Sequence, residues 1–313
     1  MKWMQLGILA ALWLGAGGRN ALGAEQPKIR ILTDFPPVYC FTANVAGDLA
    51  VVENLLPPGA DPHDYSLSPQ AAHRLAAADL LIVNGLGLES WLQRAFRNVA
   101  RPQTVVEISA GLDNELIYEV PSLAPETSSG FLAARGRAGS SFHEAPNPHI
   151  WLDPILAGRA VTNILLALQK ADPANAAGYA TNAARYAARL AALDAEMRAA
   201  LAPAKGSWLV TFHDSFAYFA RRYDLRIAGV IEKAPTVAPT PKELTALRQI
   251  VQGRKVKAIF SDPDSPRKLV DQLGRDLKLP VAQLDPLESG PLNPEAYEDA
   301  MRRNLRVFAQ YLK

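Results

Sequence analysis

Cysteine is nearly absent from this sequence, since Cys40 is the only one among 313 residues. No intramolecular disulfide can therefore form, and the apolar neighbours in PPVYCFTANVAG predict that Cys40 is a small buried core residue. An excess of positive charge is also lacking, because 33 lysines and arginines face 31 acidic residues. This balance excludes the basic surface that a nucleic-acid-binding protein requires.

Long apolar runs are missing beyond the N-terminus, where no stretch approaches the roughly 18 residues that a membrane-spanning helix needs. The N-terminal MKWMQLGILAALWLGAGG has an early lysine and a short apolar run, and small residues follow up to Ala24. This is the pattern of a secretory signal peptide, so we expect residues 1–24 to be removed and the mature chain to be exported. Removal takes two basic residues and no acid, which leaves 31 of each sign and a formal net charge of 0.

Strand and helix patterns alternate along the mature chain. Strands are predicted at 28–34, 50–56, 79–85 and 104–110, with helices at 36–47, 68–78 and 88–99. After residue 206 the pattern resumes, with strands at 207–215, 226–232, 256–262 and 280–285 and helices at 241–253, 266–277 and 294–312. Such alternation indicates βαβ units and mainly parallel sheets.

Two segments separate these two runs of elements. Residues 111–148 are rich in glycine, serine, proline and alanine and predict a long surface loop. Residues 172–202 form an alanine-rich, heptad-like stretch whose helix would exceed about 40 Å, long enough to connect two lobes. We therefore predict an α/β protein of two βα lobes joined by one long rigid helix. The N-terminal lobe would span 25–171, the linking helix 172–203 and the C-terminal lobe 204–313.

Histidine is scarce, and the positions of the five histidines are informative. His73 lies on a predicted helix among alanines and is expected to be an ordinary helix residue. His63 in DPHDY, His149 in NPHIWLDP and His213 in TFHDSF lie at predicted strand-to-helix junctions. In open α/β sheets, ligands bind at the carboxyl ends of the strands, which makes these three the candidate site residues.

The three histidines are 86 and 64 residues apart, and Asp285, at the end of a predicted strand, follows 72 residues later. These separations exclude a zinc-finger site, whose ligands come in close pairs. They suit a site between two lobes, where three imidazoles and one carboxylate could complete a tetrahedral metal sphere. By spacing alone, unrelated capping and loop residues remain the alternative.

Three segments carry a family resemblance that covers essentially the whole mature chain. PPGADPHDYSLSP, NPHIWLDP and TFHDSFAYFARRYDL resemble the ligand loops of periplasmic substrate-binding proteins of zinc and manganese ABC importers, whose two lobes share one long helix. The resemblance implies His63, His149 and His213 as metal ligands, with Asp285 of QLDPL as a fourth. KAIFSDPDSPRKL is similar to a segment that packs near the site without supplying a ligand.

The same resemblance implies a function. The chain would be a monomeric periplasmic receptor that captures Zn²⁺ in a cleft between the lobes and delivers it to an ABC-type membrane permease. Manganese members commonly carry glutamate where this chain has His213, so zinc is favoured, with Mn²⁺ or Fe²⁺ as the alternative. Many zinc members also carry a histidine-rich loop before the second ligand, whereas this chain has only His143 there.

Several residues near the expected ligands could either support the metal site or have an ordinary structural role. Pro58 and Pro62 would stiffen the loop that presents His63, which reduces the entropy lost on binding. Asp61 and Asp64 would accept a hydrogen bond from the His63 ring or cap the backbone. The aromatic residues Trp151 and Tyr65 would wall the site or belong to the core.

Two other classes of protein, enzymes and organic-solute receptors, are alternatives to a metal receptor. Three histidines with an open position also describe a catalytic zinc, but Asp285 would fill that position and no HExxH motif supplies a general base. Glu232, Asp262 and Asp264 are expected to cap or support the backbone. Receptors for organic solutes usually present aromatic residues and arginines at the strand ends, where this chain has histidines. We therefore expect no enzyme.

Overall fold

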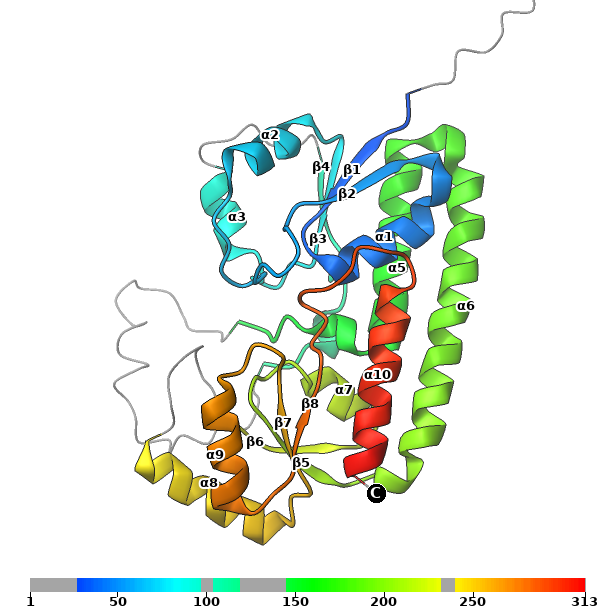
Figure 1. The fold of residues 1–313 in the computed structure, drawn as a ribbon. Coiled ribbons are helices and arrows are strands. Elements are labelled where there is room, and N and C mark those ends of the chain that lie inside the picture. The colour runs from blue at the N-terminus through cyan, green and yellow to red at the C-terminus, as the bar shows by residue number, and fades with distance from the viewer. Residues whose placement is uncertain (1–26, 97–103, 119–144, 232–239, 313) are drawn as a thin grey trace, which may run out of the picture.

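The computed structural model describes residues 27–96, 104–118, 145–231 and 240–312 (Figure 1). They form two four-stranded parallel sheets, ordered β2-β1-β3-β4 and β6-β5-β7-β8. Helices cover both sheets, and the two lobes lie one above the other along a layer of long helices. The predicted α/β class with two mainly parallel βα lobes and a long helix is confirmed.

The first lobe follows the predicted alternation closely. Its elements are β1 (Arg30–Thr33), α1 (Pro36–Ala46), β2 (Val51–Asn54), α2 (Pro69–Ala77), β3 (Leu80–Val83), α3 (Ser90–Ala95) and β4 (Thr104–Glu107). The apolar sequence of β3 is buried at all four positions because β3 is a central strand covered on both faces. The Ser68 side chain caps α2 by accepting from the Ala71 N–H, and Pro69 occupies the first helical position.

The second lobe repeats this architecture. Its elements are β5 (Trp208–Thr211), α7 (Ala217–Arg222), β6 (Arg226–Val230), α8 (Pro241–Arg254), β7 (Ile259–Ser261), α9 (Arg267–Leu277), β8 (Val281–Gln283) and α10 (Ala296–Tyr311). The central strand β5 pairs with β6 and β7, and its carboxyl end leads into the segment that carries His213.

Two long helices, α5 (Pro154–Ala171) and α6 (Ala176–Leu201), run side by side along one flank of the molecule (Figure 1). The predicted linking helix corresponds to α6, with the 3₁₀ turns Pro173–Asn175 and Ala202–Ala204 at its two ends. Helix α5 was not predicted, although its signals are present. The Asp153 carboxylate accepts from the Ile155 and Leu156 N–H groups, and buried residues recur with helical spacing at Val161, Ile164 and Leu168.

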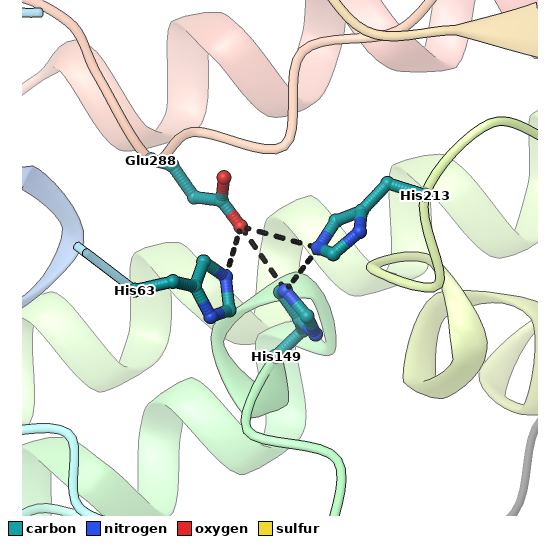
Figure 2. A group of neighbouring side chains, drawn as sticks. All are labelled: His63, His149, His213 and Glu288. Carbon is teal, nitrogen blue, oxygen red and sulfur yellow. Dashed lines mark hydrogen bonds and ion pairs between the residues drawn. The ribbon is translucent and has the colours of Figure 1, made fainter. Parts of the chain in front are cut away.

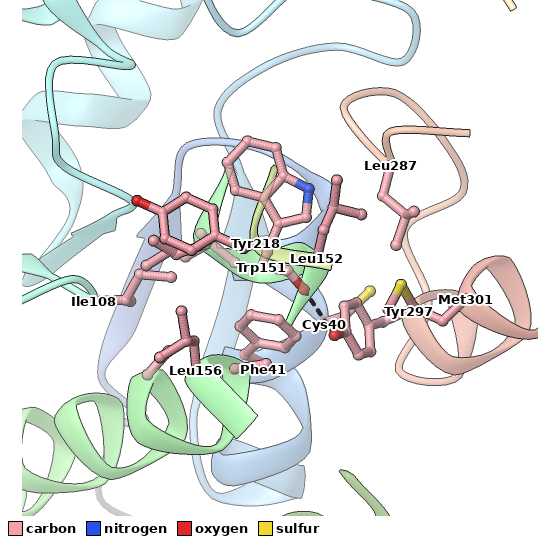
Figure 3. Close-up of a cluster of buried hydrophobic side chains, with 14 of the residues drawn as sticks. Cys40, Phe41, Ile108, Trp151, Leu152, Leu156, Tyr218, Leu287, Tyr297 and Met301 are labelled. Carbon is pink, nitrogen blue, oxygen red and sulfur yellow. Dashed lines mark hydrogen bonds between the residues drawn. The ribbon is translucent and has the colours of Figure 1, made fainter. Parts of the chain in front are cut away.

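The C-terminal helix α10 returns to the first lobe, where it packs against α1 as well as α6. The Tyr297 hydroxyl on α10 donates to the Trp151 carbonyl at 2.7 Å, and both rings are buried in the cluster of Figure 3. Cys40 belongs to the same cluster, as predicted, and its thiol donates to the Asn293 carbonyl at 3.1 Å. Burial raises the pKa of the Cys40 thiol to about 12, so the group is un-ionised and unreactive.

The segment between β8 and α10 therefore passes between the two lobes and is held by both. None of the helices in the described ranges combines the length and apolar character of a membrane span. Three parts of the sequence analysis lie outside the described residues: the signal peptide, most of the loop 111–148 with His143, and Glu232.

Candidate metal centre

Four side chains from four separate segments converge between the lobes (Figure 2). His63 lies between β2 and α2, and His149 directly precedes the 3₁₀ turn Ile150–Leu152 that leads into α5. His213 follows β5, and Glu288 follows β8. Each offers a nitrogen or oxygen atom within 4.8 Å of the other three. The carboxyl ends of the parallel strands thus bring together residues that are 225 positions apart in sequence.

The distances within this group are those of a small-ion site. The Glu288 Oε1 atom lies 3.0 Å from His149 Nε2, 3.2 Å from His63 Nε2 and 4.0 Å from His213 Nε2. The Nε2 atoms of His149 and His213 are 3.1 Å apart. In a tetrahedral zinc site with bonds of about 2.0–2.1 Å, ligand atoms lie roughly 3.3 Å from one another. The distances from Glu288 to His63 and His149 and the distance between His149 and His213 are therefore close to those around a single bound Zn²⁺, and the distance from Glu288 to His213 is longer.

The loop that presents His63 is held by a hydrogen bond within the loop and by contacts with Trp91 on α3. The Asp61 carboxylate accepts from the His63 backbone N–H at 2.8 Å, so it caps the backbone. The Trp91 indole N–H donates to the Pro62 carbonyl at 2.9 Å, and the Tyr65 ring packs edge-on against Trp91 with centroids 5.1 Å apart. Tyr65 therefore supports this loop by packing beneath it.

His149 is the most buried member of the group, with 1% of its side chain exposed. The Asn147 Oδ1 atom accepts from the His149 backbone N–H at 3.0 Å and lies 2.8 Å from the ring Nδ1. Because an amide oxygen only accepts hydrogen bonds, Nδ1 carries a ring proton, and Nε2 is the nitrogen that faces Glu288 and His213 and that would lose its proton to bind a metal. The motif NPHIWLDP contains Asn147, but no signal in the sequence predicts a function for this residue.

Asn147 also connects the His149 segment to the His213 segment. Its Nδ2 atom donates to the Asp214 carbonyl at 3.0 Å and to the Asp214 carboxylate at 3.3 Å. The Tyr218 hydroxyl on α7 donates to the Asn147 carbonyl at 2.7 Å. A single buried amide thus fixes the tautomer of one histidine and the position of the loop that carries another.

The electrostatics of the site follow from burial and from the Glu288 charge. Burial alone would raise the pKa of the Glu288 carboxyl, but its hydrogen bonds to His149 and His63 outweigh burial and hold the pKa well below its usual range. Burial disfavours the charged form of His63, yet the hydrogen bond and charge of Glu288 prevail and raise the pKa of His63. Burial and the neighbouring His149 lower the pKa of His213.

The sequence analysis predicted Asp285 as the fourth ligand. In the structure, the carboxylate that joins the three histidines belongs to Glu288. The Asp285 Oδ1 atom accepts from the Leu287 N–H at 2.8 Å, and its Oδ2 atom lies 3.6 Å from Arg303. Asp285 lines the same cavity, but these contacts hold its carboxylate to its own loop and to α10, and it lies outside the group of four. Only the position of Glu288 after a strand, three residues beyond Asp285, could have indicated it in the sequence.

Trp151 links this loop to the His149 segment. Its indole N–H donates to the Pro286 carbonyl at 2.8 Å, and its ring centroid lies 5.0 Å from that of His149. The Trp151 ring is fully buried, so it is a core residue that also backs the site.

A cavity of about 490 Å³ opens in front of the group. It is lined by His63, His213 and Glu288 and by the carboxylate residues Asp61, Asp262, Asp264 and Asp285, whereas the buried His149 is not part of its lining. An ion that enters from the cavity meets the two more exposed histidines and Glu288 before it reaches His149.

Residues 31–311 match the family described as the periplasmic component A of the zinc-uptake complex, ZnuA. The chain belongs to this family. It is 33% identical over 307 residues to the high-affinity zinc uptake system protein ZnuA of Paracoccus denitrificans, with 90% of each chain covered. It is 31% identical over 250 residues to the iron-binding protein YfeA of Yersinia pestis, with 78% of this chain and 74% of that protein covered.

Solved structures agree with the two-lobed fold. A crystal structure of ZnuA superimposes with a TM-score of 0.76 at 25% identity and covers 91% of this chain and all of its own length. The Ni²⁺ complex of the binding protein FpvC from Pseudomonas aeruginosa superimposes with a TM-score of 0.75 at 29% identity, with 91% of this chain and 97% of that chain covered. The family is one of uptake components and not of enzymes.

Proposed function

We propose that this ZnuA-family protein is an extracytoplasmic receptor that binds one Zn²⁺ through His63, His149, His213 and Glu288 and delivers it to an ABC-type membrane permease. The observation that carries the proposal is the convergence of three imidazole nitrogens and one carboxylate oxygen within 4.8 Å of one another, with Glu288 Oε1 3.0–4.0 Å from the three Nε2 atoms. Imidazole nitrogen and carboxylate oxygen are ordinary zinc ligands, and four of them complete a tetrahedral sphere.

Zinc is favoured over the harder divalent cations because three of the four ligands are nitrogens. Manganese prefers oxygen ligands, and ferrous iron ranks between manganese and zinc in affinity for nitrogen-rich sites. The iron-binding relative YfeA and the Mn²⁺ complex of FpvC support the same receptor class with Mn²⁺ or Fe²⁺ cargo as the alternative.

Capture is achieved because the ligands come from both lobes. His63 belongs to the first lobe, His213 belongs to the second, and Glu288 lies on the segment that passes between them. A bound ion therefore crosslinks the lobes, and delivery requires the permease to separate the ligands. Helices α6 and α10 are packed along both lobes, which limits the movement to small displacements of loops or lobes.

Location and assembly follow the same proposal. The segment 1–24 is removed as a signal peptide, and the mature receptor works as a monomer in the periplasm, without nucleic acid as a partner. The zinc-hydrolase alternative is disfavoured because a fourth protein ligand, Glu288, fills the position that a catalytic water would need. A receptor for an organic solute would purify without stoichiometric metal.

Elemental analysis of the mature protein, stripped and then reloaded with zinc and manganese in competition, tests the proposal. The expected result is close to one zinc per chain, and its loss in His63→Ala, His149→Ala and His213→Ala. The matched control is His73→Ala, which removes an exposed histidine on α2 and should leave the zinc content unchanged. Retention of one zinc in all three site variants would exclude this site, and a preference for manganese would select the alternative cargo.

A further inference from the structure

We infer that Asp285 is a positioning residue that fixes the backbone of Leu287 and so aims the Glu288 carboxylate at the metal, and that Asp285 is itself not a ligand. This inference rests on the proposed function, because it concerns the same metal site. It assigns two adjacent carboxylates different roles, with Glu288 as the ligand and Asp285 as its support.

The backbone just before Glu288 has an unusual conformation. Leu287 has a φ of +65°, in the left-handed region that residues with a side chain rarely adopt. The Asp285 Oδ1 atom accepts from the Leu287 N–H at 2.8 Å, which forms the Asx turn that stabilises such a bend. Because Glu288 follows Leu287 directly, the direction of its side chain depends on this turn.

A glycine would adopt this conformation without help, but the protein has a leucine there, which is 95% buried. The Leu287 side chain packs with the core cluster that contains Tyr297 and Met301 (Figure 3). The side chain therefore anchors the loop to α10, and the Asp285 carboxylate offsets the backbone cost of placing a leucine at a left-handed position.

Asp285 is itself held by α10 through three contacts. Its N–H donates to Asn304 Oδ1 at 2.9 Å, and its carbonyl accepts from Asn304 Nδ2 at 2.7 Å. Asn304 is 2% exposed, and Arg303 lies 3.6 Å from the Asp285 Oδ2 atom. To reach a metal ion, the Asp285 carboxylate would have to leave both Arg303 and the Leu287 N–H.

The residue between Asp285 and Leu287 is fixed as well, since the Pro286 carbonyl accepts from the Trp151 indole N–H at 2.8 Å. Three successive residues before Glu288 are thus tied to α10 or to the His149 segment. The ligand at position 288 is preorganised by contacts that lie outside the metal sphere, and such supporting contacts typically change metal affinity by about 10–100-fold when they are removed.

The test compares Asp285→Asn, Asp285→Ala, the double variant Asp285→Ala/Leu287→Gly and Glu288→Gln. Zinc affinity is measured by competition with a chromophoric chelator. The visible spectrum of the Co²⁺-loaded protein reports the ligand set, and circular dichroism with thermal unfolding confirms folding. Asp285→Asn matters most because an amide oxygen still accepts from the Leu287 N–H but is a poor substitute for a carboxylate ligand.

We expect Asp285→Asn to retain zinc affinity within about threefold and to retain the Co²⁺ spectrum. Asp285→Ala should weaken zinc binding by about tenfold with an unchanged spectrum, the lower end of the range for supporting residues. The added Leu287→Gly change should restore part of this loss, because glycine adopts a positive φ unaided. Glu288→Gln should cause a larger loss than any of these and an altered spectrum.

The inference is overturned if Asp285→Asn changes the Co²⁺ spectrum and weakens binding as much as Glu288→Gln. It is also overturned if Leu287→Gly restores nothing in a folded Asp285→Ala protein. A failure of the proposed function has a different signature, in which His149→Ala and His213→Ala retain stoichiometric zinc whatever the Asp285 variants do.

Discussion

Replacing Asn147 with alanine should weaken zinc binding by about 10–100-fold, although Asn147 is not a proposed ligand. The change removes the acceptor of the His149 ring proton and both hydrogen bonds to Asp214. Each hydrogen bond contributes roughly 1 kcal/mol net, and the loss of the ring contact also frees the His149 tautomer and orientation. The three contacts sum to about 3 kcal/mol, and we expect about 1.4–2.7 kcal/mol of it to act on the binding equilibrium, which corresponds to the 10–100-fold loss of affinity.

The assay is zinc competition at pH 7 with Asn147→Ala, Asn147→Asp and the wild type, with thermal unfolding of each apo protein as the control for folding. Asn147→Asp keeps an oxygen that accepts from the His149 ring, so it should bind more tightly than the alanine variant. Its new charge faces the Asp214 carboxylate, so it should still bind more weakly than the wild type. A folded Asn147→Ala protein with affinity within threefold of the wild type would refute this role for Asn147.

Two further predictions concern protonation. Zinc affinity should fall as pH decreases through the pKa of His63, which Glu288 holds above 6.5, because the imidazole must lose its proton to bind metal. Glu288→Gln should move the onset of this fall to lower pH, and an affinity that is constant between about pH 5 and 8 would contradict the assignment. In the first lobe, burial raises the pKa of Asp34 to about 6 and that of its neighbour Glu89 well above its usual value, so the folded state binds protons that the unfolded state releases above about pH 4. The free energy of unfolding should therefore decrease as pH rises from about 4 through 6. Glu89→Gln should raise the melting temperature at pH 8 relative to the wild type, as measured by differential scanning calorimetry. An equal or lower melting temperature of this variant at pH 8 would contradict the cost that we assign to the buried pair.

The three histidines could be predicted from the sequence because each lies at a predicted strand-to-helix junction and in a segment that resembles a ligand loop of the family, and the segments of His63 and His149 are also stiff or capped. Pro62 and Asp61 shape the His63 loop, and Asp153 and Pro154 begin the helix that follows His149. These signals act over a few residues, so they are visible in the chain itself. Strand alternation then indicates which ends of the sheets meet.

Glu288 could not be predicted in this way because distant residues determine its direction. The loop is fixed by Asn304 on α10 and by Trp151 before α5, and neither contact has a local signal. Leu287 adds to the difficulty, because a left-handed position is usually marked by glycine or asparagine and here has leucine. The sequence pattern indicates the acid of QLDPL, Asp285, but tertiary contacts hold its carboxylate to its own loop and to α10.

Helix α5 was not predicted for a different reason. Its cap at Asp153 and its apolar residues with helical spacing are local signals, but the alanine-rich stretch that forms α6 is the only helix that we predict between the two lobes. Helix α5 packs against α6 and against α1 of the first lobe, whereas α6 continues to the second lobe, where Asp194 accepts from Arg222. This pairing supports the small amplitude expected for lobe movement.

Zinc K-edge X-ray absorption of the zinc-loaded protein would test the central claim, the ligand set itself, most directly. The predicted spectrum has four nitrogen or oxygen neighbours at about 2.0–2.1 Å, with the outer-shell scattering of three imidazoles and no sulfur. His213→Ala should lose one imidazole from this pattern. A sulfur neighbour near 2.3 Å, or fewer than three imidazoles in the wild type, would contradict the site of His63, His149, His213 and Glu288.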